Sequence, residues 1–225
     1  MRYEIKGDSL PYIVLTLDKG ETIHTEKGAM SWMSETLQMS TNAGGSLGKM
    51  FSRMFSGESI FQNTYTATQN GDFIALASSF PGQIMAVDVT NRPIIAQKKA
   101  FLARENSVDM SIFFQKKLGA GFFGGEGFIM QKFEGNGYVF LEIDGSLVEY
   151  DLHSNESLIL DTGHLAAMES SVKMDIVTNK GVKNVLFGGE GLFSTKVTGP
   201  GKIWVQSMPI YKLMSYFPVD NSANN

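Results

Sequence analysis

The sequence repeats itself, and this repeat narrows the possible folds more than any other feature of the chain. The block GGEGFIMQKFEGNGYVFLEIDG (124–145) aligns without a gap on GGEGLFSTKVTGPGKIWVQSMP (188–209). Gly125 thus matches Gly189, which lies 64 positions later. A gapless match that keeps turn, acidic and hydrophobic residues in phase indicates that one structural unit occurs twice.

A third, more diverged copy precedes these two. The stretch SGESIFQNTYTATQNGDFIALAS (56–78) places Gly57-Glu58 and Asn70-Gly71 where the later copies have their Gly-Glu pair and their Gly-x-Gly turn. The chain is therefore predicted to contain three tandem units in a pseudo-threefold arrangement. Their predicted boundaries are 1–81, 82–146 and 147–225, the last with a C-terminal tail.

Within each unit the pattern is one of short strands and turns. The runs DFIALA, YVFLEI and KIWVQS are rich in β-branched and aromatic residues, and each follows a turn with Asn-Gly or Gly-Pro-Gly. We expect each turn to close a β-hairpin. The runs IVLTLD, IMAVDV and LVEYDL open the three units at equivalent places. The sequence therefore predicts an all-β protein.

Two apolar stretches do not fit a strand pattern. In 46–57 the apolar residues recur at the spacing of an amphipathic helix, and 111–123 is its counterpart in the second unit. Both are predicted to be short helical insertions that either cover an open end of a sheet or dock on a protein partner or a membrane surface. The residues of this predicted interaction surface are Met50, Phe51, Met54, Phe55, Phe113 and Phe114.

Composition excludes several classes of function. The 19 Lys and Arg residues are outnumbered by 23 Asp and Glu residues, so no basic excess is available to neutralise a nucleic-acid backbone. The absence of cysteine excludes disulfides and thiolate metal sites. The first 20 residues lack the apolar core of a signal peptide, and no apolar run reaches about 20 residues. We expect a cytoplasmic protein, with peripheral membrane association through its apolar stretches as an alternative.

Two stretches match catalytic or cofactor-binding motifs in sequence, but neither has the predicted structural context that the motif needs. GAGFFG (119–124) has the glycines of a dinucleotide-binding loop but precedes a predicted strand instead of following one. GGSLG (44–48) could present Ser46 as a nucleophile, with Asp161 and His164 after it, but the parallel α/β sheet that this chemistry uses is missing. The sequence therefore predicts no catalytic residue and no cofactor.

The repeated acid is the remaining candidate for chemistry. Glu58, Glu126 and Glu190 hold the same place in the three units, so units packed around one axis could bring three carboxylates near a hard cation such as Ca²⁺. Alternatively, each Glu accepts hydrogen bonds within its own turn. The three histidines (His24, His153 and His164) are not at equivalent positions and lack metal-ligand spacing. Four glycines are expected to serve the turns, namely Gly125, Gly137, Gly189 and Gly201.

The stretches KGAMSWMS, GGEG and GPGKIWVQSMP together resemble the AIM/TRAP-like family, which comprises bacterial proteins of unassigned function related to a mitochondrial biogenesis protein. The likeness spans nearly the whole chain. It implies three domains similar to the trp RNA-binding attenuation protein, each a short double-stranded β-helix of β-sandwich type. The resemblance supplies no catalytic residues, and kinship with an RNA binder does not transfer RNA binding to an acidic chain.

Two functional classes follow from these observations. The first is a non-enzymatic scaffold or protein-interaction module, whose apolar stretches would provide any membrane association. The second is a β-barrel that binds a small ligand or a metal ion. Sheets that do not close expose pairing edges, so the sequence also predicts at most a small homo-oligomer.

Overall fold

Antiparallel β-strands dominate the computed structural model, in which residues 1–42, 62–116, 127–178 and 193–215 are described. The all-β prediction is confirmed. In chain order the strands are β1 (Arg2–Lys6), β2 (Tyr12–Leu17), β3 (Thr22–Glu26), β4 (Met30–Met33), β5 (Gln38–Asn42), β6 (Gln62–Thr66), β7 (Asp72–Ala77), β8 (Gly82–Asp88), β9 (Ile94–Gln97), β10 (Phe101–Glu105), β11 (Val108–Lys116), β12 (Phe128–Gly135), β13 (Tyr138–Asp144), β14 (Leu147–Leu152), β15 (Ser157–Asp161), β16 (Leu165–Glu169), β17 (Lys173–Thr178), β18 (Phe193–Thr198) and β19 (Gly201–Gln206). The described helical elements are the 3-10 turns η1 (Lys98–Ala100) and η3 (Thr162–His164) and the α-helix α3 (Ile210–Ser215).

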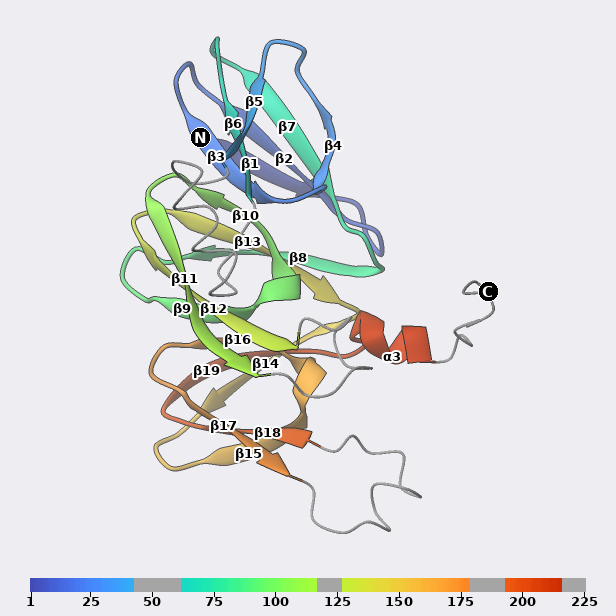
Figure 1. Ribbon diagram of the computed structural model, residues 1–225, viewed down its shortest axis with the longest axis vertical. Coiled ribbons are helices and arrows are strands. Elements are labelled where there is room, and N and C mark those ends of the chain that lie inside the picture. Colours follow the sequence, from blue (N-terminus) through green and yellow to red (C-terminus); the bar gives the residue numbers. More distant parts are fainter. Residues whose placement is uncertain (43–61, 117–126, 179–192, 216–225) are drawn as a thin grey trace, which may run out of the picture.

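The strands form four sheets that stack along the long axis of the molecule (Figure 1). Sheet 1 has the order β1-β2-β7-β4, and sheet 4, at the opposite end, has the order β15-β18-β17. Between them lie sheet 2, β5-β6-β3-β10-β13-β8, and sheet 3, β11-β12-β9-β16-β19-β14. Each inner sheet therefore joins strands that are far apart in the sequence.

Three hydrophobic cores fill the spaces between the four sheets. Core 1 joins sheets 1 and 2 and includes Ile13, Leu15, Ile74, Tyr65 and Phe140. Core 2 joins sheets 2 and 3 and includes Phe101, Phe133, Val139, Leu141 and Trp204. Core 3 joins sheets 3 and 4 and includes Ile95, Met130, Met168, Val197 and Ile203.

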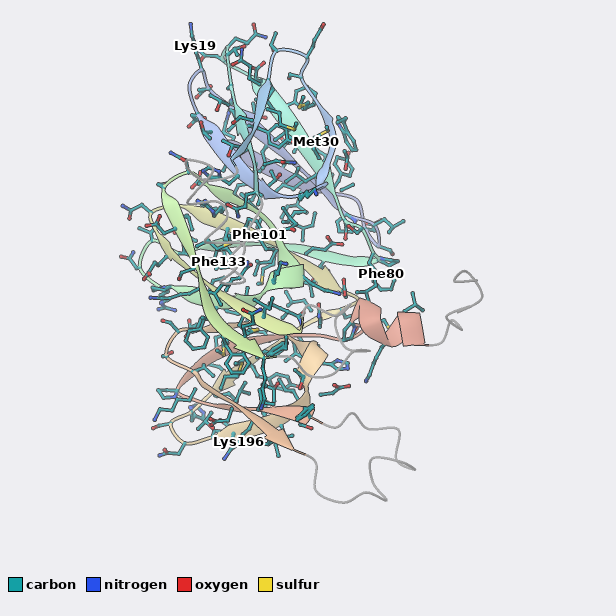
Figure 2. The ribbon with its side chains drawn as sticks, in the orientation of Figure 1. Lys19, Met30, Phe80, Phe101, Phe133 and Lys196 are labelled. Atoms are coloured by element: carbon teal, nitrogen blue, oxygen red, sulfur yellow. The ribbon has the colours of Figure 1, made fainter. Side chains whose placement is uncertain are left out.

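The inner sheets are covered on both faces. Along β13, Phe140 belongs to core 1, whereas its neighbours Val139 and Leu141 belong to core 2. The rings of Phe101 and Phe133 stack between sheets 2 and 3 with centroids 5.4 Å apart (Figure 2). Burial on both faces explains why YVFLEI is almost continuously apolar, since strict alternation is expected only of a strand with one wet face.

Strand pairing recurs along the chain with the same local irregularity. β10 pairs with β13, β16 with β19 and β4 with β7, and each pair contains one register shift near the start of its first strand. β8 begins at Gly82 and β14 at Leu147. The unit boundaries at 81/82 and 146/147 stay a prediction. The pseudo-threefold arrangement is not confirmed, because β4 and β15 end sheets at opposite ends of the molecule (Figure 1).

The hairpin prediction is wrong. The strands on either side of each Gly-rich turn lie in different sheets: β6 in sheet 2 and β7 in sheet 1, β12 in sheet 3 and β13 in sheet 2, β18 in sheet 4 and β19 in sheet 3. Both edges of β13, for example, are occupied, by β8 and by β10. The turns therefore carry the chain from one sheet to the next across a core.

The helical insertion predicted over 111–123 is also wrong in the part that the structure describes. Residues up to Lys116 belong to β11, a nine-residue strand paired with β12. Met110 and Phe114 pack against cores 2 and 3, and this burial together with the ladder to β12 outweighs the local helix-like spacing. The other predicted insertion, 46–57, lies outside the described residues.

Candidate functional site

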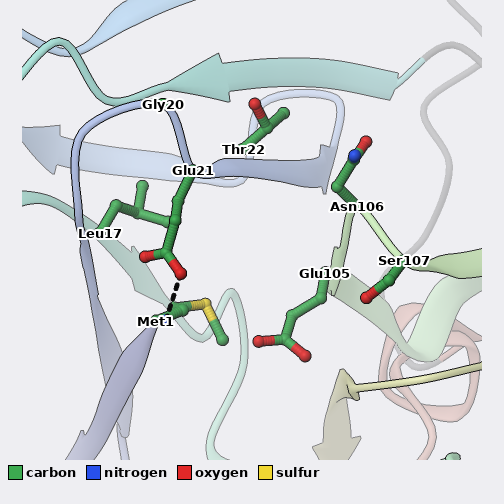
Figure 3. Close-up of a pocket in the computed structure, with 8 residues that line it drawn as sticks. All are labelled: Met1, Leu17, Gly20, Glu21, Thr22, Glu105, Asn106 and Ser107. Atoms are coloured by element: carbon green, nitrogen blue, oxygen red, sulfur yellow. Dashed lines mark hydrogen bonds and ion pairs between the residues drawn. The ribbon is translucent and has the colours of Figure 1, made fainter.

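A cleft of about 270 Å³ opens where the first and second predicted units meet (Figure 3). Its wall is formed by the turn between β2 and β3, by the start of β1 and by the turn after β10. The polar or charged residues that line it include Glu21, Thr22, Glu105, Asn106 and Ser107. Two carboxylates facing one cleft make it the first place to look for chemistry.

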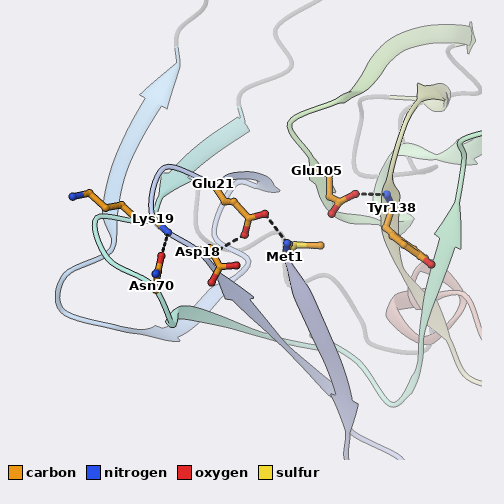
Figure 4. A network of polar contacts seen from close by, with 7 residues as sticks. All are labelled: Met1, Asp18, Lys19, Glu21, Asn70, Glu105 and Tyr138. Atoms are coloured by element: carbon orange, nitrogen blue, oxygen red, sulfur yellow. Dashed lines mark hydrogen bonds and ion pairs between the residues drawn. The ribbon is translucent and has the colours of Figure 1, made fainter.

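Glu21 is engaged in local contacts (Figure 4). Its Oε1 accepts a hydrogen bond of 2.6 Å from the amino group of Met1, and its Oε2 accepts one of 2.7 Å from the Asp18 N–H. Burial alone would raise the pKa of Glu21, but these hydrogen bonds and the charge of Met1 outweigh burial and lower it. The ionised Glu21 therefore ties the first strand to the β2–β3 turn.

Glu105 is likewise engaged with the backbone. Its Oε2 accepts a hydrogen bond of 2.8 Å from the Tyr138 N–H, at the point where β13 begins (Figure 4). A Cβ atom added to Gly137 would lie 2.1 Å from the same oxygen, and Gly137 has a φ of 137°. The backbone conformation therefore favours glycine at this position, and a larger residue would also displace the carboxylate that holds the turn.

The same contact occurs elsewhere in the chain. Glu169 Oε2 accepts from the Lys202 N–H at 3.1 Å, and both residues lie 64 positions beyond Glu105 and Tyr138. Near the N-terminus, Ser34 Oγ accepts from the N–H at the start of β7 at 3.0 Å. Because the contact recurs at three sheet-to-sheet turns, we interpret it as support for those turns.

A partly buried polar cluster lies behind the cleft, between β3 and β10. His24 Nε2 contacts Asn106 Oδ1 at 2.9 Å and His24 Nδ1 contacts Thr64 Oγ1 at 3.0 Å. Arg104 Nη2 donates to Gln62 Oε1 at 3.0 Å. Burial lowers the pKa of His24, and the nearby charge of Arg104 acts in the same direction against the hydrogen bond to Asn106.

This cluster predicts a pH dependence of stability. The folded state holds His24 with a lowered pKa, so the unfolded chain binds a proton more readily than the folded chain does. The contribution of neutral His24 is present above its unfolded pKa of about 6.5 and is lost as the pH falls below that value. We expect His24→Gln to flatten the decrease in stability between about pH 7 and pH 5, measured by urea unfolding.

His153→Gln is the matched control, because His153 is exposed on the turn after β14. The control variant should keep the decrease in stability of the unmodified chain. An unaltered slope in His24→Gln would show that the pH response arises elsewhere.

A second cleft, of about 370 Å³, is lined by Lys98, Lys99, Glu142 and Asp144. Glu142 Oε1 accepts three hydrogen bonds, from the Ser78 hydroxyl and from the N–H groups of residues 79 and 80. Asp144 accepts from the first N–H of helix α3 at 2.8 Å, and burial raises the pKa of Asp144 despite that bond. Both carboxylates hold the segments that flank the cleft.

Of the hydrolase-like motif, the structure describes Asp161 and His164, which are both engaged with helix α3. Asp161 and His164 both contact Lys212 Nζ of helix α3, at 3.3 Å and 2.9 Å. His164 Nδ1 contacts the Gln206 carbonyl at 2.8 Å, so both ring nitrogens have partners. Ser46 lies outside the described residues.

The predicted interaction residues are only partly described. Phe113 is 48% exposed and sits at the register shift of β11, whereas Phe114 is half-buried with its ring 6.2 Å from that of Phe128. Gly137 and Gly201 have φ of 137° and 134°. The candidates that lie outside the described residues are Met50, Phe51, Met54, Phe55, Glu58, Gly125, Glu126, Gly189 and Glu190.

Sequence reasoning missed the turn-holding acids. Glu105 and Glu169 are separated by the same 64 positions as the repeated blocks, so extending the alignment upstream would have paired them. In the part of the chain that the structure describes, no group of three His, Cys, Asp or Glu side chains could hold a metal ion. Of the carboxylates that line the two described clefts, those of Glu21, Glu105, Glu142 and Asp144 accept hydrogen bonds from neighbouring backbone groups.

Comparison with known proteins found a matching family, a protein of similar sequence and a solved structure of similar fold. Residues 3–208 match the protein family described as Mitochondrial biogenesis AIM24. An uncharacterised protein of Streptococcus pyogenes serotype M6 is 28% identical over 236 aligned residues, which cover 99% of this chain and 93% of that protein. The crystal structure of a Streptococcus pyogenes protein matches with a TM-score of 0.79 at 24% identity, over 96% of this chain and 97% of that one, and shows the same fold. Among the described residues, no helix is long and apolar enough to cross a membrane.

Proposed function

Because the chain belongs to the family described as Mitochondrial biogenesis AIM24, and its described clefts are built from carboxylates that hold turns, we propose that it is a non-enzymatic scaffold. Its partner is a protein that docks on the outer edge of sheet 3, along β11. The observation that carries this proposal is Phe113, an aromatic side chain that is 48% exposed on that edge.

An exposed edge strand offers unpaired N–H and C=O groups to a strand from a partner. β11 has nine residues, and its counterparts at the edges of sheets 2 and 4, β5 and β17, have five and six. Exposed charges at Asp109 and Lys116 and the register shift beside Phe113 limit unselective pairing along this edge. An aromatic residue within such an edge is the type of side chain that supplies most of the binding energy at protein interfaces.

Site-specific photocrosslinking tests the proposal. Benzoylphenylalanine placed at position 113 should give a light-dependent adduct of one defined mass in lysate of the native host. The matched position is Val148, which is 38% exposed on β14 at the opposite edge of the same sheet. An adduct common to both positions, or none at 113, would contradict the proposal, and an adduct with lipid alone would favour membrane docking.

Phe113→Ser provides the energetic test once the partner has been identified by its adduct. We expect binding to weaken by about tenfold or more, since the loss of an aromatic anchor costs on the order of 2 kcal/mol. The change in unfolding free energy should stay below about 1 kcal/mol, because Phe113 is half exposed. Binding is measured by calorimetry and stability by urea unfolding, with Val148→Ser as the control.

A further inference from the structure

Sheets 2 and 3 each consist of two groups of three strands, and we call the strand pair that joins the two groups a junction. β3 pairs with β10 and so joins the first three strands of sheet 2 to the last three, and β9 pairs with β16 in the same way in sheet 3. Arg104 lies opposite His24 in the first junction, and Met168 lies opposite Ile95 in the second. Both pairings are antiparallel and use equivalent residues of their strands.

The two strands that would form a third junction are β15 and β4. β15 pairs with β18 as β9 pairs with β12, and β4 pairs with β7 as β10 pairs with β13. Both are end strands: among the described strands, none pairs with the outer edge of β15 or of β4. They lie at opposite ends of the molecule, so one copy cannot pair its own two ends (Figure 1).

The end strand β15 exposes a side chain whose counterpart at a junction is buried. Ile159 is 69% exposed, whereas Ile95, 64 positions earlier in the corresponding strand, is 1% exposed within core 3. A large β-branched aliphatic side chain on an open edge invites pairing, which proteins otherwise prevent with charge. β4 reads MSWM, and β15 reads SLILD with its single charge at the end.

An aromatic–alanine pair lies at the equivalent place in sheets 1, 2 and 3. Phe140 lies opposite Ala103 in sheet 2, and Trp204 lies opposite Ala167 in sheet 3. Both aromatic side chains are buried, because each fills the core between its own sheet and the preceding one. Sheet 1 has the pair with the two residue types exchanged, Trp32 opposite Ala75.

Trp32 differs from its counterparts in exposure. It is 46% exposed, and its ring lies 5.3 Å from that of Tyr12. None of the described strands forms a sheet on the outer side of sheet 1, so no core formed by the described strands covers the aromatic residue of this pair. If β15 of a second copy paired with β4, sheet 4 of that copy would extend sheet 1. Trp32 would then face core 3 of that copy, because core 3 borders sheet 4 on the inner side of β15.

The residue types at the open ends also match each other. The first junction pairs two polar residues, His24 and Arg104, and the second pairs two apolar ones, Ile95 and Met168. By the same register Ile159 would meet Met33, which repeats the apolar version of the contact. A charged or polar mismatch, which would disfavour pairing, is absent from this position.

We propose that the chain assembles head to tail, with β15 of one copy paired antiparallel to β4 of a second copy. The resulting sheet would run β17-β18-β15 in one copy and β4-β7-β2-β1 in the next. This inference uses a different surface from the β11 edge and does not rest on the proposed scaffold function. The predicted register places Trp32 opposite Leu160, Met33 opposite Ile159 and Ser34 opposite Leu158.

Such a contact joins two different surfaces, so it is heterologous and leaves an open β4 and an open β15 on every dimer. The assembly therefore closes into a ring or continues as a filament, and an isologous dimer is excluded by the proposal. Mass measurement distinguishes these forms from one another, and each of them contains the same contact.

Disulfide trapping tests the contact directly, because the natural sequence has no cysteine. Opposite residues of antiparallel strands have Cα atoms about 4.5–5.5 Å apart, which suits a disulfide. A mixture of Met33→Cys and Ile159→Cys proteins should give a covalent dimer that contains one copy of each variant. Neither variant alone should do so, and circular dichroism establishes that both are folded.

The control mixture combines Met33→Cys with Val148→Cys, which places the second thiol on β14, an exposed edge outside the proposed contact. A dimer yield no greater than in this control would overturn the proposal. Covalent dimers from Met33→Cys alone would also overturn it, since they would show that two β4 edges meet.

Self-association gives an independent readout that needs no cysteine. Ile159→Lys should weaken assembly at least tenfold in native mass spectrometry and light scattering, because the lysine places a charge where core 1 of the next copy would close. Val148→Lys should leave assembly unchanged. A chain that stays monomeric at high concentration before any substitution would refute the head-to-tail contact.

Discussion

Gly135→Ala is expected to destabilise the protein by about 3–5 kcal/mol, through backbone strain and overpacking together. Gly135 has a φ of 132°, which L-residues avoid. An added Cβ atom would lie 2.3 Å from the carbonyl oxygen of Ser107 and 3.1 Å from the Cα of Val108. Since that carbonyl accepts the Asn136 N–H at 3.2 Å, it cannot move away without breaking a turn contact.

Gly71→Ala separates the two causes. Gly71 has a φ of 85°, but no atom lies within 4 Å of the Cβ that alanine would add. We expect a cost of about 1–2 kcal/mol from conformational strain alone. Guanidinium unfolding of both variants measures the difference, and equal losses would show that the Ser107 carbonyl yields freely.

Phe140→Ala is expected to cost about 3–5 kcal/mol, because it empties a fully buried aromatic position in core 1. The Phe140 ring lies 5.3 Å from that of Tyr3 and 6.3 Å from that of Tyr138. Its cross-strand neighbour is Ala103, which is too small to fill the cavity. Thermal and chemical unfolding should both show the loss.

Trp32→Ala is the matched comparison, since Trp32 is the aromatic member of the corresponding pair in sheet 1. Its side chain is 46% exposed, so we expect a cost below about 1.5 kcal/mol at concentrations where the chain is monomeric. A loss equal to that of Phe140→Ala would mean that Trp32 supports the fold of a single copy as strongly as a buried core residue does.

The strands were predictable, and their partners were not. The runs DFIALA, YVFLEI and KIWVQS carry β-forming residues between turn signals, and they became β7, β13 and β19. Pairing depends on contacts between residues distant in sequence, which local patterns do not encode. The Gly-rich turns therefore predict hairpins, although β13 pairs with β8 and β10 and leaves β12 in another sheet.

The helical prediction around Phe113 was wrong for a related reason. Its apolar residues, taken with the glycines that follow, resembled the helix-like spacing of 46–57. In the structure Met110 and Phe114 pack against cores, while the register shift leaves Phe113 exposed. A single extra residue in a strand alters which side chain faces outward, and the amino-acid pattern alone gives no sign of it.

The candidate site was predictable only in its general character. The sequence singled out the repeated acids Glu58, Glu126 and Glu190, whereas the described clefts contain other carboxylates, which are engaged with turns and helix α3. The cluster of His24, Arg104 and Asn106 could not be foreseen, because its members approach one another only when β3 pairs with β10. The resemblance to a family of mitochondrial biogenesis proteins was confirmed over residues 3–208.

Core 1 is completed by residues that are synthesised at different times. Core 1 contains Leu76 of β7, yet it also needs Phe140, which the ribosome adds 64 residues later. At roughly 5–20 residues per second this interval lasts on the order of 3–13 s. During that time the apolar face of the newly made β2 and β7 has no completed cover, so the nascent chain presents a binding surface to chaperones that the finished protein has lost.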